Sequence, residues 1–352
     1  MFEFDFHPVA STTGEGTTKS GDAITGRFID DQGVQRVIVI DAGYQATGET
    51  VVEHIRKYYG TSRVDLAIST HPDADHINGM SVVLEELAVG ELLIHRPRLH
   101  AGPLVSLFSN IETVDNLLNV ALDNDTLVSD PFTGAERFDG QVKVLGPEKD
   151  FYSDLVAEHL AAVASGTKSV SLSASLRNRA GSLLESVLDW LPVEETLTDA
   201  GETNPRNETS VITLITVGAH RLLLTGDAGQ RSLTRVVEEY ESLIGPFATY
   251  PLRLFQAPHH GSRRNIGPTL LNRILGERGM PHSDTTSAII SAAKDNPKHP
   301  SPKVTNALLR RGAFVAVTAG QTVCSFEEAP VRSGWGPISP MPPLDEGADD
   351  DV

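Results

Sequence analysis

Short apolar segments of strand length alternate along the chain with longer segments whose apolar residues recur at helical spacing. In the first part of the chain, residues 24–30 and 36–40 are predicted strands, separated by a polar DDQG turn. Residues 49–59 place valine, isoleucine and tyrosine on one helical face, and the Gly60 that follows is typical of a helix end. Residues 64–70 have the length and composition of a buried strand. This order of strand, helix and strand predicts an α/β fold.

The remainder of the chain continues the same mixture of strands and helices. The Gly218-Ala219-His220 turn between two apolar segments predicts a hairpin. In chain order, further strands are predicted at residues 91–95, 141–145, 209–217, 221–225, 252–256, 287–291, 313–318 and 321–326. Further helices are predicted at residues 80–89, within 104–122, at 229–243 and at 301–311.

We expect residues 1–330 to form one domain that carries a single insertion. Residues 148–206 contain helical patterning and a serine-rich stretch but no strand signals, which indicates a mainly helical insertion or flap. Residues 331–352 are rich in Pro, Gly and Asp, a composition typical of a disordered acidic tail. A chain of 352 residues is long enough to bury an ample core.

Composition narrows the function classes. The chain has 47 acidic and 29 basic residues, a net charge of −18, and this acidity disfavours a protein that binds DNA or anionic membranes non-specifically. The one cysteine, Cys324, excludes an internal disulfide framework and a zinc site built from cysteines. We find neither a secretory signal nor an apolar run of membrane-spanning length, so we expect a cytoplasmic protein without membrane association.

A polar loop directly after the predicted strand 64–70 contains four side chains of metal-binding type. His71, Asp73, Asp75 and His76 fall within six residues of one another. Ligand sites in α/β proteins lie at strand ends, and imidazole nitrogen and carboxylate oxygen suit a divalent ion such as zinc, manganese or iron. The alternative is a surface turn whose side chains only cap the next helix.

Two further polar segments come directly after apolar strands. Asp227 follows the predicted strand 221–225, where its carboxylate could bridge two cations or could instead cap the next helix. His259 and His260 follow strand 252–256, where one imidazole could bind a metal ion while the other faces the substrate, unless both face solvent. Each segment is weak evidence by itself, but the occurrence of all three in this order is specific.

Together the three segments resemble the metallo-β-lactamase superfamily, and most closely the hydrolase domain of competence-type DNA-uptake channel proteins, the ComEC-like branch. The order is a His-x-Asp-x-Asp-His loop, a strand ending in Thr-Gly-Asp, and a strand ending in His-His-Gly-Ser. The resemblance extends over residues 20–326, and no run of membrane helices accompanies it. Its supporting segments are Ser20-Gly21-Asp22-Ala23, Asp41-Ala42-Gly43, Asn207-Glu208-Thr209-Ser210 and Asn296-Pro297-Lys298-His299-Pro300.

This resemblance implies a four-layer αββα sandwich with a metal site at one edge of the two sheets. The metal-binding residues that it implies are His71, Asp73, Asp75, His76, Asp227 and His259. In this arrangement His71 and Asp73 hold one ion, Asp75 and His76 hold the second, and Asp227 bridges the two.

Two positions depart from the pattern of the superfamily. Asp73 stands where the usual motif has a second histidine, and exchanging a nitrogen donor for an oxygen donor favours manganese or iron without excluding zinc. The separate histidine ligand expected before Asp227 has no clear counterpart, and Asn207 is the candidate for its place. We therefore expect one or two divalent metal ions.

The resemblance implies hydrolysis by a hydroxide that the metal generates from water. Asp75 or Asp227 would orient this nucleophile, and His260 or His299 would protonate the leaving group. In the alternative, His299 is only a turn residue before the helix at 301–311.

The substrate expected first is a phosphodiester in a nucleotide or nucleic acid. Arg263 and Arg264 follow the His-His-Gly-Ser segment and could hold a phosphate, although they could also be solvated surface charge. Two alternatives stay open: hydrolysis of a lactam, lactone or thioester, and a non-catalytic metal-binding regulatory protein. Residues 148–206 could contact a protein partner in any of these cases. A diiron oxygen reductase is disfavoured, because the chain shows no flavin-binding loop.

Overall fold

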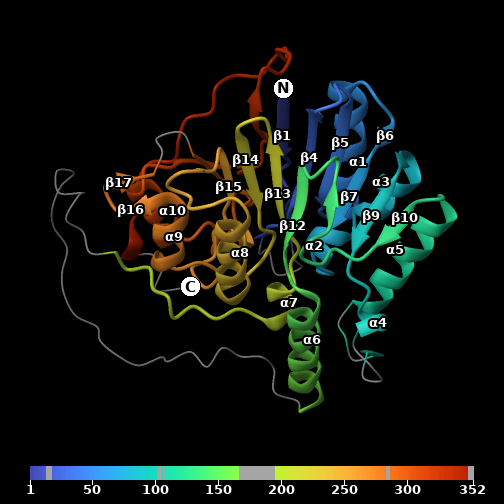
Figure 1. Ribbon diagram of the computed structural model, residues 1–352, viewed down its shortest axis with the longest axis horizontal. Coiled ribbons are helices and arrows are strands. Elements are labelled where there is room, and N and C mark those ends of the chain that lie inside the picture. Colours follow the sequence, from blue (N-terminus) through green and yellow to red (C-terminus); the bar gives the residue numbers. More distant parts are fainter. Residues whose placement is uncertain are drawn as a thin grey trace.

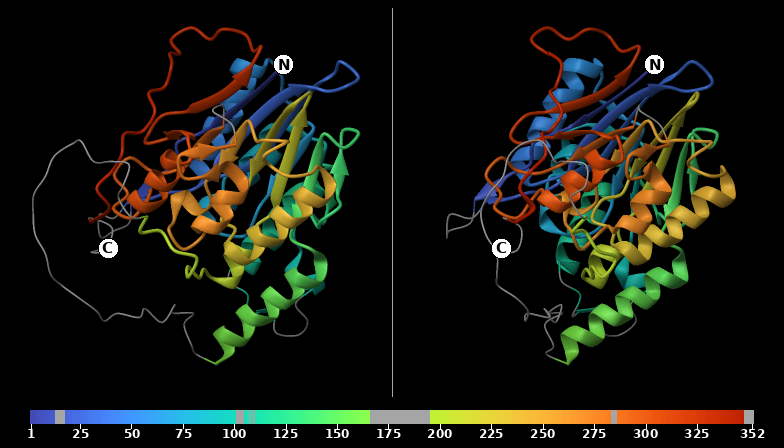
Figure 2. Two further views of the ribbon diagram at one scale, coloured as in Figure 1. Left: turned by 60° about the vertical axis from the view of Figure 1, so that its left-hand side comes forward. Right: turned by 90° about the vertical axis from the view of Figure 1, so that its left-hand side faces the viewer.

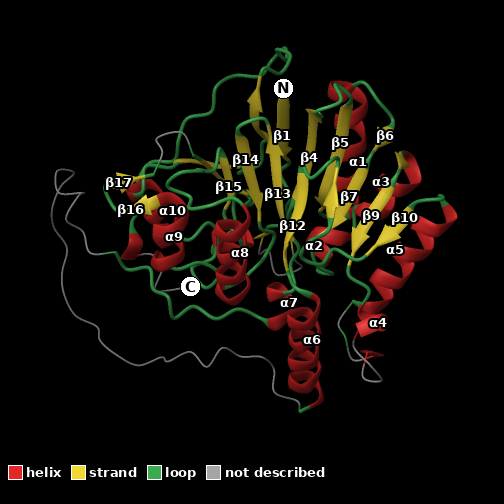
Figure 3. Ribbon diagram, viewed as in Figure 1, coloured by secondary structure: helices red, strands yellow, loops and turns green. Residues whose placement is uncertain are grey.

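Two seven-stranded sheets lie face to face, with helices on the outer side of each (Figures 1 and 3). The computed structural model describes residues 1–12, 18–100, 105–106, 108, 110–165, 195–282 and 286–347. The four layers are helix, sheet, sheet and helix, which confirms the αββα class expected from the sequence.

The first sheet is built mainly from the amino-terminal half of the chain. Its antiparallel part joins the first strand to the last one of the chain, and its parallel part carries the first metal-binding segment. In spatial order the strands are β10 (Leu127–Ser129), β9 (Glu91–Ile94), β7 (Leu66–Ser69), β5 (Gln35–Ala42), β4 (Ala23–Ile29), β1 (Phe2–Phe6) and β20 (Val323–Glu327).

The second sheet comes from the carboxy-terminal half. Its first four strands pair antiparallel, and the next three add in parallel. In spatial order the strands are β11 (Glu136–Arg137), β12 (Val142–Gly146), β13 (Ile212–Val217), β14 (His220–Leu224), β15 (Leu254–Gln256), β18 (Ser287–Ile290) and β19 (Phe314–Val317). The hairpin expected around residues 218–220 joins β13 to β14.

Helices cover the outer faces. Those on the first sheet are α1 (Gln45–His54), continued by a π-helical turn at Ile55–Tyr59, α3 (Met80–Glu86) and α5 (Ile111–Asp123). Those on the second are α8 (Gln230–Leu243), α9 (Pro268–Leu275) and α10 (Pro302–Arg310). Short helices form in the connections: α2 (Ala74–Ile77), α4 (Pro97–His100) and α7 (Pro205–Glu208). None of the described helices is long and apolar enough to cross a membrane.

Neighbouring residues of the central strands face different cores. In β5, Ile38 packs between the two sheets, whereas Val39 packs under the helices of the first sheet. In β14, Leu222 faces the first sheet and Leu223 faces the helices of the second. Because successive side chains of a strand point to opposite sides, a strand buried on both faces is apolar throughout. This explains why these strands were recognisable as continuous apolar segments.

The first strand of the protein, β1, was not expected from the sequence. Its apolar residues Phe2, Phe4 and Phe6 pack between the sheets, while Glu3 and Asp5 are buried on the other side. Buried carboxylates are costly unless they are paired. The partners come from distant parts of the chain, so the local pattern gave no indication of two-sided burial.

Residues 331–347 pack against the domain, in contrast to the disorder expected for 331–352. Arg332 forms ion pairs with buried carboxylates of β1, and the ring of Trp335 lies 5.6 Å from that of Tyr58. Further along, the Asn306 side chain exchanges hydrogen bonds with the backbone of Leu344. These contacts differ from the expected disorder, because specific side-chain contacts can hold a segment of polar composition. Residues 348–352 lie outside the described residues.

The expected insertion begins as a single helix. Helix α6 (Lys149–Ala164) lies below the two sheets in Figures 1 and 2, and its Tyr152, Val156 and Leu160 pack against Phe108. Residues 195–208 return to the domain and end in α7. The serine-rich stretch at 166–194 lies outside the described residues.

We expect replacement of Arg332 by alanine to lower the free energy of unfolding by about 3–5 kcal/mol, because it removes the cation that two buried carboxylates share. The guanidinium nitrogens lie 2.7 and 2.8 Å from the oxygens of Asp5 and 3.0 Å from Glu3 Oε2. The control is Arg56→Ala, which removes an exposed ion pair with Glu86 and should cost less than about 1 kcal/mol. Urea unfolding measures both, and equal small losses would contradict the prediction.

We expect His7 to make the domain less stable in acid. Burial, aided by the charge of His54, lowers the pKa of His7 to about 3, whereas the unfolded chain has the ordinary value near 6.5. Between these values the unfolded state binds the proton more readily, so stability falls as the pH falls. The stability advantage of the wild type over His7→Gln should therefore shrink below pH 6.5, by up to about 1.4 kcal/mol per pH unit. A pH-independent difference in urea unfolding would contradict this.

Candidate metal centre

Strand ends of both sheets meet at one edge and bring three loops together. In the first sheet, β7 leads into His71. In the second, the parallel strands β14 and β15 lead into Asp227 and into the short turn that holds His259 and His260. Two backbone hydrogen bonds tie this edge together, Val211 N–H to Thr70 O at 3.0 Å and His259 N–H to Gly226 O at 3.0 Å.

The carboxylate of Asp227 lies at the centre of four imidazoles. Its Oδ2 is 3.6 Å from His71 Nε2 and 3.5 Å from His259 Nε2. Its Oδ1 is 3.4 Å from His76 Nε2 and 3.9 Å from His260 Nε2. Oδ2 is therefore the nearer oxygen for His71 and His259, and Oδ1 is the nearer one for His76 and His260.

Several of these atoms are buried without a hydrogen-bond partner. They are His71 Nε2, His76 Nε2, His260 Nε2 and Asp227 Oδ1. Buried polar atoms are rarely left unpaired, and such atoms indicate an absent ligand or ion. Donor atoms about 2.1 Å from a tetrahedral metal ion are about 3.4 Å apart, close to the separations found here. The donor set therefore fits divalent ions on both sides of Asp227.

Asp75 adds a carboxylate to one side only. Its Oδ2 lies 3.8 Å from His260 Nε2, and Asp75, His76 and His260 form one group able to hold a metal ion. Asp227, His259 and His260 form another such group. The structure therefore brings together five of the six residues expected as ligands, and it adds His260, which we had expected to act on the substrate.

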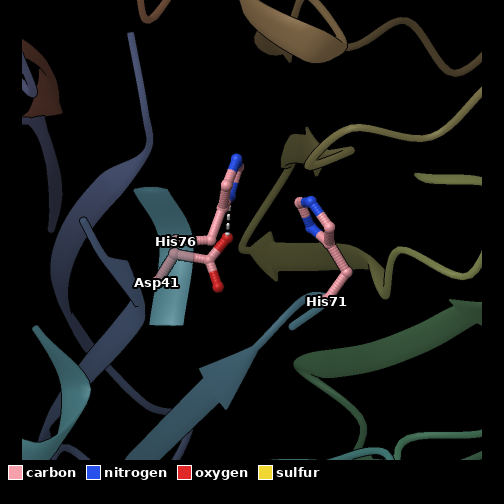
Figure 4. Close-up of side chains that lie close together, drawn as sticks. All are labelled: Asp41, His71 and His76. Atoms are coloured by element: carbon pink, nitrogen blue, oxygen red, sulfur yellow. Dashed lines mark hydrogen bonds and ion pairs between the residues drawn. The ribbon is translucent and has the colours of Figure 1, made fainter. Parts of the chain in front are cut away.

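Asp41 and Thr70 hold the first two histidines in the orientation that metal binding requires. His76 Nδ1 donates a hydrogen bond to Asp41 Oδ2 at 2.8 Å, which Figure 4 shows as a dashed line. Thr70 Oγ1 donates to the same oxygen at 2.6 Å, so its own oxygen accepts from His71 Nδ1 at 3.0 Å. With both Nδ1 atoms protonated, each Nε2 keeps a free lone pair directed at Asp227.

His260 is held in the same way. Its Nδ1 donates to the carbonyl oxygen of Ser291 at 2.9 Å, which again leaves Nε2 as the free donor atom for a metal. His259 Nδ1 lies 3.2 Å from Asn207 Nδ2 and 3.1 Å from Asn265 Oδ1. Asn207, the residue expected in place of a missing ligand, therefore contacts Nδ1 of His259, whereas Nε2 of His259 lies towards Asp227.

The electrostatics of the cluster favour a positive ion. Burial alone would raise the pKa of Asp227, but the surrounding histidines bring it well below its usual value. Burial alone would lower the pKa of His76, yet Asp227 and Asp41 raise it well above its ordinary value. For the same reason the pKa of His260 rises to about 9, with Asp227 and Asp75 outweighing burial. Carboxylates thus draw protons onto these rings, and the same field attracts a metal ion.

Asp22 is a further buried acid of the cluster that the sequence interpretation used only as a supporting mark. Its Oδ2 lies 3.8 Å from His76 Nδ1 and accepts a hydrogen bond from Gln256 at 3.0 Å. Burial, reinforced by the charge of Asp227, raises its pKa. Asp22 directly precedes β4, and Asp41 lies near the end of β5. These positions at strand ends next to the site could have indicated that both acids belong to the cluster.

Asp73 is the expected ligand whose carboxylate is paired with an arginine. Its Oδ2 lies 3.8 Å from His71 Nε2, but its carboxylate is paired with Arg206, with Oδ1 to Nε at 2.7 Å and Oδ2 to Nη2 at 3.0 Å. Among the described residues, Asp73 belongs to none of the groups of three that could hold a metal. Arg206 had no signal in the sequence, because nothing in its spacing connects it with the loop at 71–76.

His299 does reach the site. Its ring centre lies 5.7 Å from that of His259 and 6.1 Å from that of His260. Asn296 positions the loop by accepting a hydrogen bond from His299 N–H at 3.1 Å and donating one to Ser20 Oγ at 2.8 Å. Burial, with the charges of His260 and His259, lowers the pKa of His299 to about 3, so its ring is neutral at pH 7 in this arrangement.

A cleft of about 580 Å³ opens beside His259. The three residues expected near a substrate, Asn207, Arg263 and Arg264, all line it. The other charged or titratable residues of its lining are Asp73, Glu158, Glu202, Arg206, His259, Lys298 and His299. The cleft therefore presents basic side chains next to the candidate metal centre, although the chain as a whole is acidic.

Comparison with known proteins finds similarity only among solved structures. No protein-family model and no curated protein matches the sequence. One similar structure is a Thermotoga maritima protein assigned as a metallo-β-lactamase, with 16% identity over 64% of this chain and 78% of that one, at a TM-score of 0.34. Another is a mutant of the β-hydroxylase CmlA, with 12% identity over 92% of this chain and 53% of that one, at a TM-score of 0.45.

Similarities this distant say nothing about reaction or substrate. Neither structure is described as a ComEC-like protein, so the resemblance to that branch stays a prediction.

We expect Asp41→Asn to weaken metal binding about 10- to 100-fold, because it disturbs the hydrogen bond that orients His76. Asparagine suits the site sterically, since residue 41 has a φ of 52° and Asn tolerates that region. The control is Asp30→Asn, a buried carboxylate that holds a turn and Arg36 elsewhere. Competition with a chromogenic chelator gives both affinities, and an unchanged affinity for Asp41→Asn would contradict the assignment.

Proposed function

We propose that this protein is a metal-dependent hydrolase and that its substrate is a phosphate ester, with a phosphodiester as the first choice. The observation that carries the proposal is the set of unpaired, buried nitrogen and oxygen atoms around Asp227. A hydrophobic or purely structural core has no use for four imidazoles directed at one carboxylate.

The residues that would hold the metal ions fall into two groups. His71 and His259 face Oδ2 of Asp227, and His76, His260 and Asp75 face the side of Oδ1. Divalent ions in such a site supply a nucleophile from water at neutral pH and polarise the oxygen of the scissile bond.

The protein's own contribution is to hold these groups rigidly. His76, His71 and His260 donate hydrogen bonds from Nδ1 to Asp41, Thr70 and the Ser291 carbonyl, which leaves Nε2 of these three rings directed inward. Asp227 joins both groups from a position that is 2% exposed, which excludes water from its flanks. His299 lies at the border between these histidines and the cleft, where its ring can hydrogen-bond to a bound substrate.

The cleft favours phosphate over a neutral carbonyl substrate. Arg206, Arg263, Arg264 and Lys298 all line it, and guanidinium groups bind phosphate oxygens with good geometry. No Phe, Tyr or Trp is found among its described lining residues, so it offers no aromatic platform for stacking a run of bases. A nucleotide or the end of a strand therefore fits better than an extended single strand.

The test begins with metal content. Protein purified without chelator or metal-affinity resin should contain about two equivalents of manganese, iron or zinc. The double variant Asp75→Ala, His76→Ala should lose at least one of them, and Asp227→Asn should bind both ions more weakly. Asp123→Ala, an exposed acid of α5, is the control and should keep the full content. Absence of metal from the wild type, even after metal is added, would refute the proposal.

Activity should follow metal content. With the metal that is found, bis(p-nitrophenyl) phosphate should be cleaved at least about 100-fold faster by the wild type than by Asp227→Asn, because that substitution affects both ions. Cleavage of a lactam, lactone or thioester in preference to the diester would assign the site to carbonyl chemistry instead.

A further inference from the structure

Asp73 and Arg206 form a side-on pair at the boundary between the histidine cluster and the cleft. We propose that Asp73 is a positioning residue that holds Arg206 as the binding group for an anionic part of the substrate, and that it is not a metal ligand. This inference rests on the proposed function for its kinetic consequences, but the pair and its anion binding can be measured without catalysis.

The pairing leaves Asp73 poorly placed for a metal. Both of its oxygens lie within 3.0 Å of Arg206 nitrogens, whereas its contact with the cluster is 3.8 Å, to His71 Nε2. The guanidinium neutralises the carboxylate, and its Nη2–H donates a hydrogen bond to Oδ2. The 2.7 Å contact between Nε and Oδ1 is an ion pair without hydrogen-bond geometry. Asp75, two residues later, has no such partner and belongs to a group of three that could hold an ion.

Arg206 itself is held firmly at its backbone. Its N–H donates to Asn204 Oδ1 at 2.9 Å, and its carbonyl oxygen accepts from Thr209 Oγ1 at 2.6 Å. The next turn is tied to α8, because Glu208 Oε2 accepts hydrogen bonds from Ser232 N–H at 2.9 Å and from its hydroxyl at 2.6 Å. A guanidinium fixed at both ends loses little freedom when it binds an anion.

The remaining N–H donors of the Arg206 guanidinium are consistent with a role in binding an anion. Asp73 accepts a hydrogen bond from Nη2 and forms an ion pair with Nε. The described residues provide no hydrogen-bond partner for Nη1, and Arg206 lines the cleft. The adjacent Asn207 contacts His259, so the anion would lie close to the candidate metal centre. Lys298 and Arg263 also line the cleft and would add positive charge to it.

The first test separates the two roles of Asp73 by metal content. We expect Asp73→Asn and Arg206→Gln to keep the wild-type number of metal ions per chain, measured by elemental analysis. Loss of an equivalent in Asp73→Asn, with full content in Arg206→Gln, would show that Asp73 is a ligand and would overturn the proposal. The matched controls are Asp115→Asn and Arg98→Gln, which break a similar side-on pair that lies outside the cleft lining.

The second test measures anion binding by metal-free protein, with pyrophosphate as the calorimetric probe. We expect both Asp73→Asn and Arg206→Gln to raise its dissociation constant at least about fivefold, and the double variant to add little, because the two side chains act as one unit. Arg206→Lys should restore part of the affinity. Unchanged affinity in Arg206→Gln would overturn the proposal, and additive losses would disprove the positioning role of Asp73. These binding measurements do not depend on hydrolysis. The inference can therefore fail while the proposed function holds, and the proposed function can fail while the inference holds.

With the metal-loaded enzyme, the same variants should raise KM about 10-fold or more while kcat changes less, because the pair binds a group of the substrate away from the reacting bond. A fall in kcat at constant KM in Asp73→Asn would contradict the inference.

Discussion

The carboxylate of Asp227, buried among four imidazoles, is the constraint on which the arrangement of this edge depends. Its two oxygens lie 3.4–3.9 Å from the Nε2 atoms of four histidines, which follow strands of both sheets. The strand ends of the two sheets must therefore lie side by side at this edge. Such a group is tolerated in the interior only with cations or donors around it. The hydrogen bonds of Asp41, Thr70 and Ser291 serve the same end, because they direct lone pairs rather than N–H groups at the centre.

Much of the fold could be predicted because its strands are buried on both faces. Segments 36–40 and 221–225 contain the continuous apolar runs 37–40 and 222–224, and they match β5 and β14 within a few residues. Strand β1 was missed because Glu3 and Asp5 find their cations, Arg27 and Arg332, far along the chain. The ordered contacts of residues 331–347 were missed for the same reason, since composition does not reveal an arginine that inserts between buried acids.

The candidate site was predictable where residues follow a strand directly, and less so where a distant side chain intervenes. The loops after β7, β14 and β15 supplied His71, Asp227 and the histidine pair as expected. The site differs from the sequence prediction where a side chain from a distant segment makes a contact. Asn207 contacts His259 Nδ1, and Arg206 forms an ion pair with Asp73. No spacing rule connects residues 73 and 206, which are neighbours only because α7 returns to the same edge of the sandwich.

The position of β1 has a consequence for the order in which the chain can reach its final state. This strand precedes the other described strands along the chain, yet it lies between β4 and β20, the last of them. Arg332, beyond β20, forms ion pairs with both of its acids. Until these residues leave the ribosome, Glu3 and Asp5 remain in water, where their charges cost nothing. The first sheet therefore closes only when synthesis reaches β20, and a fragment that ends earlier has an open edge next to two acids that lack Arg332.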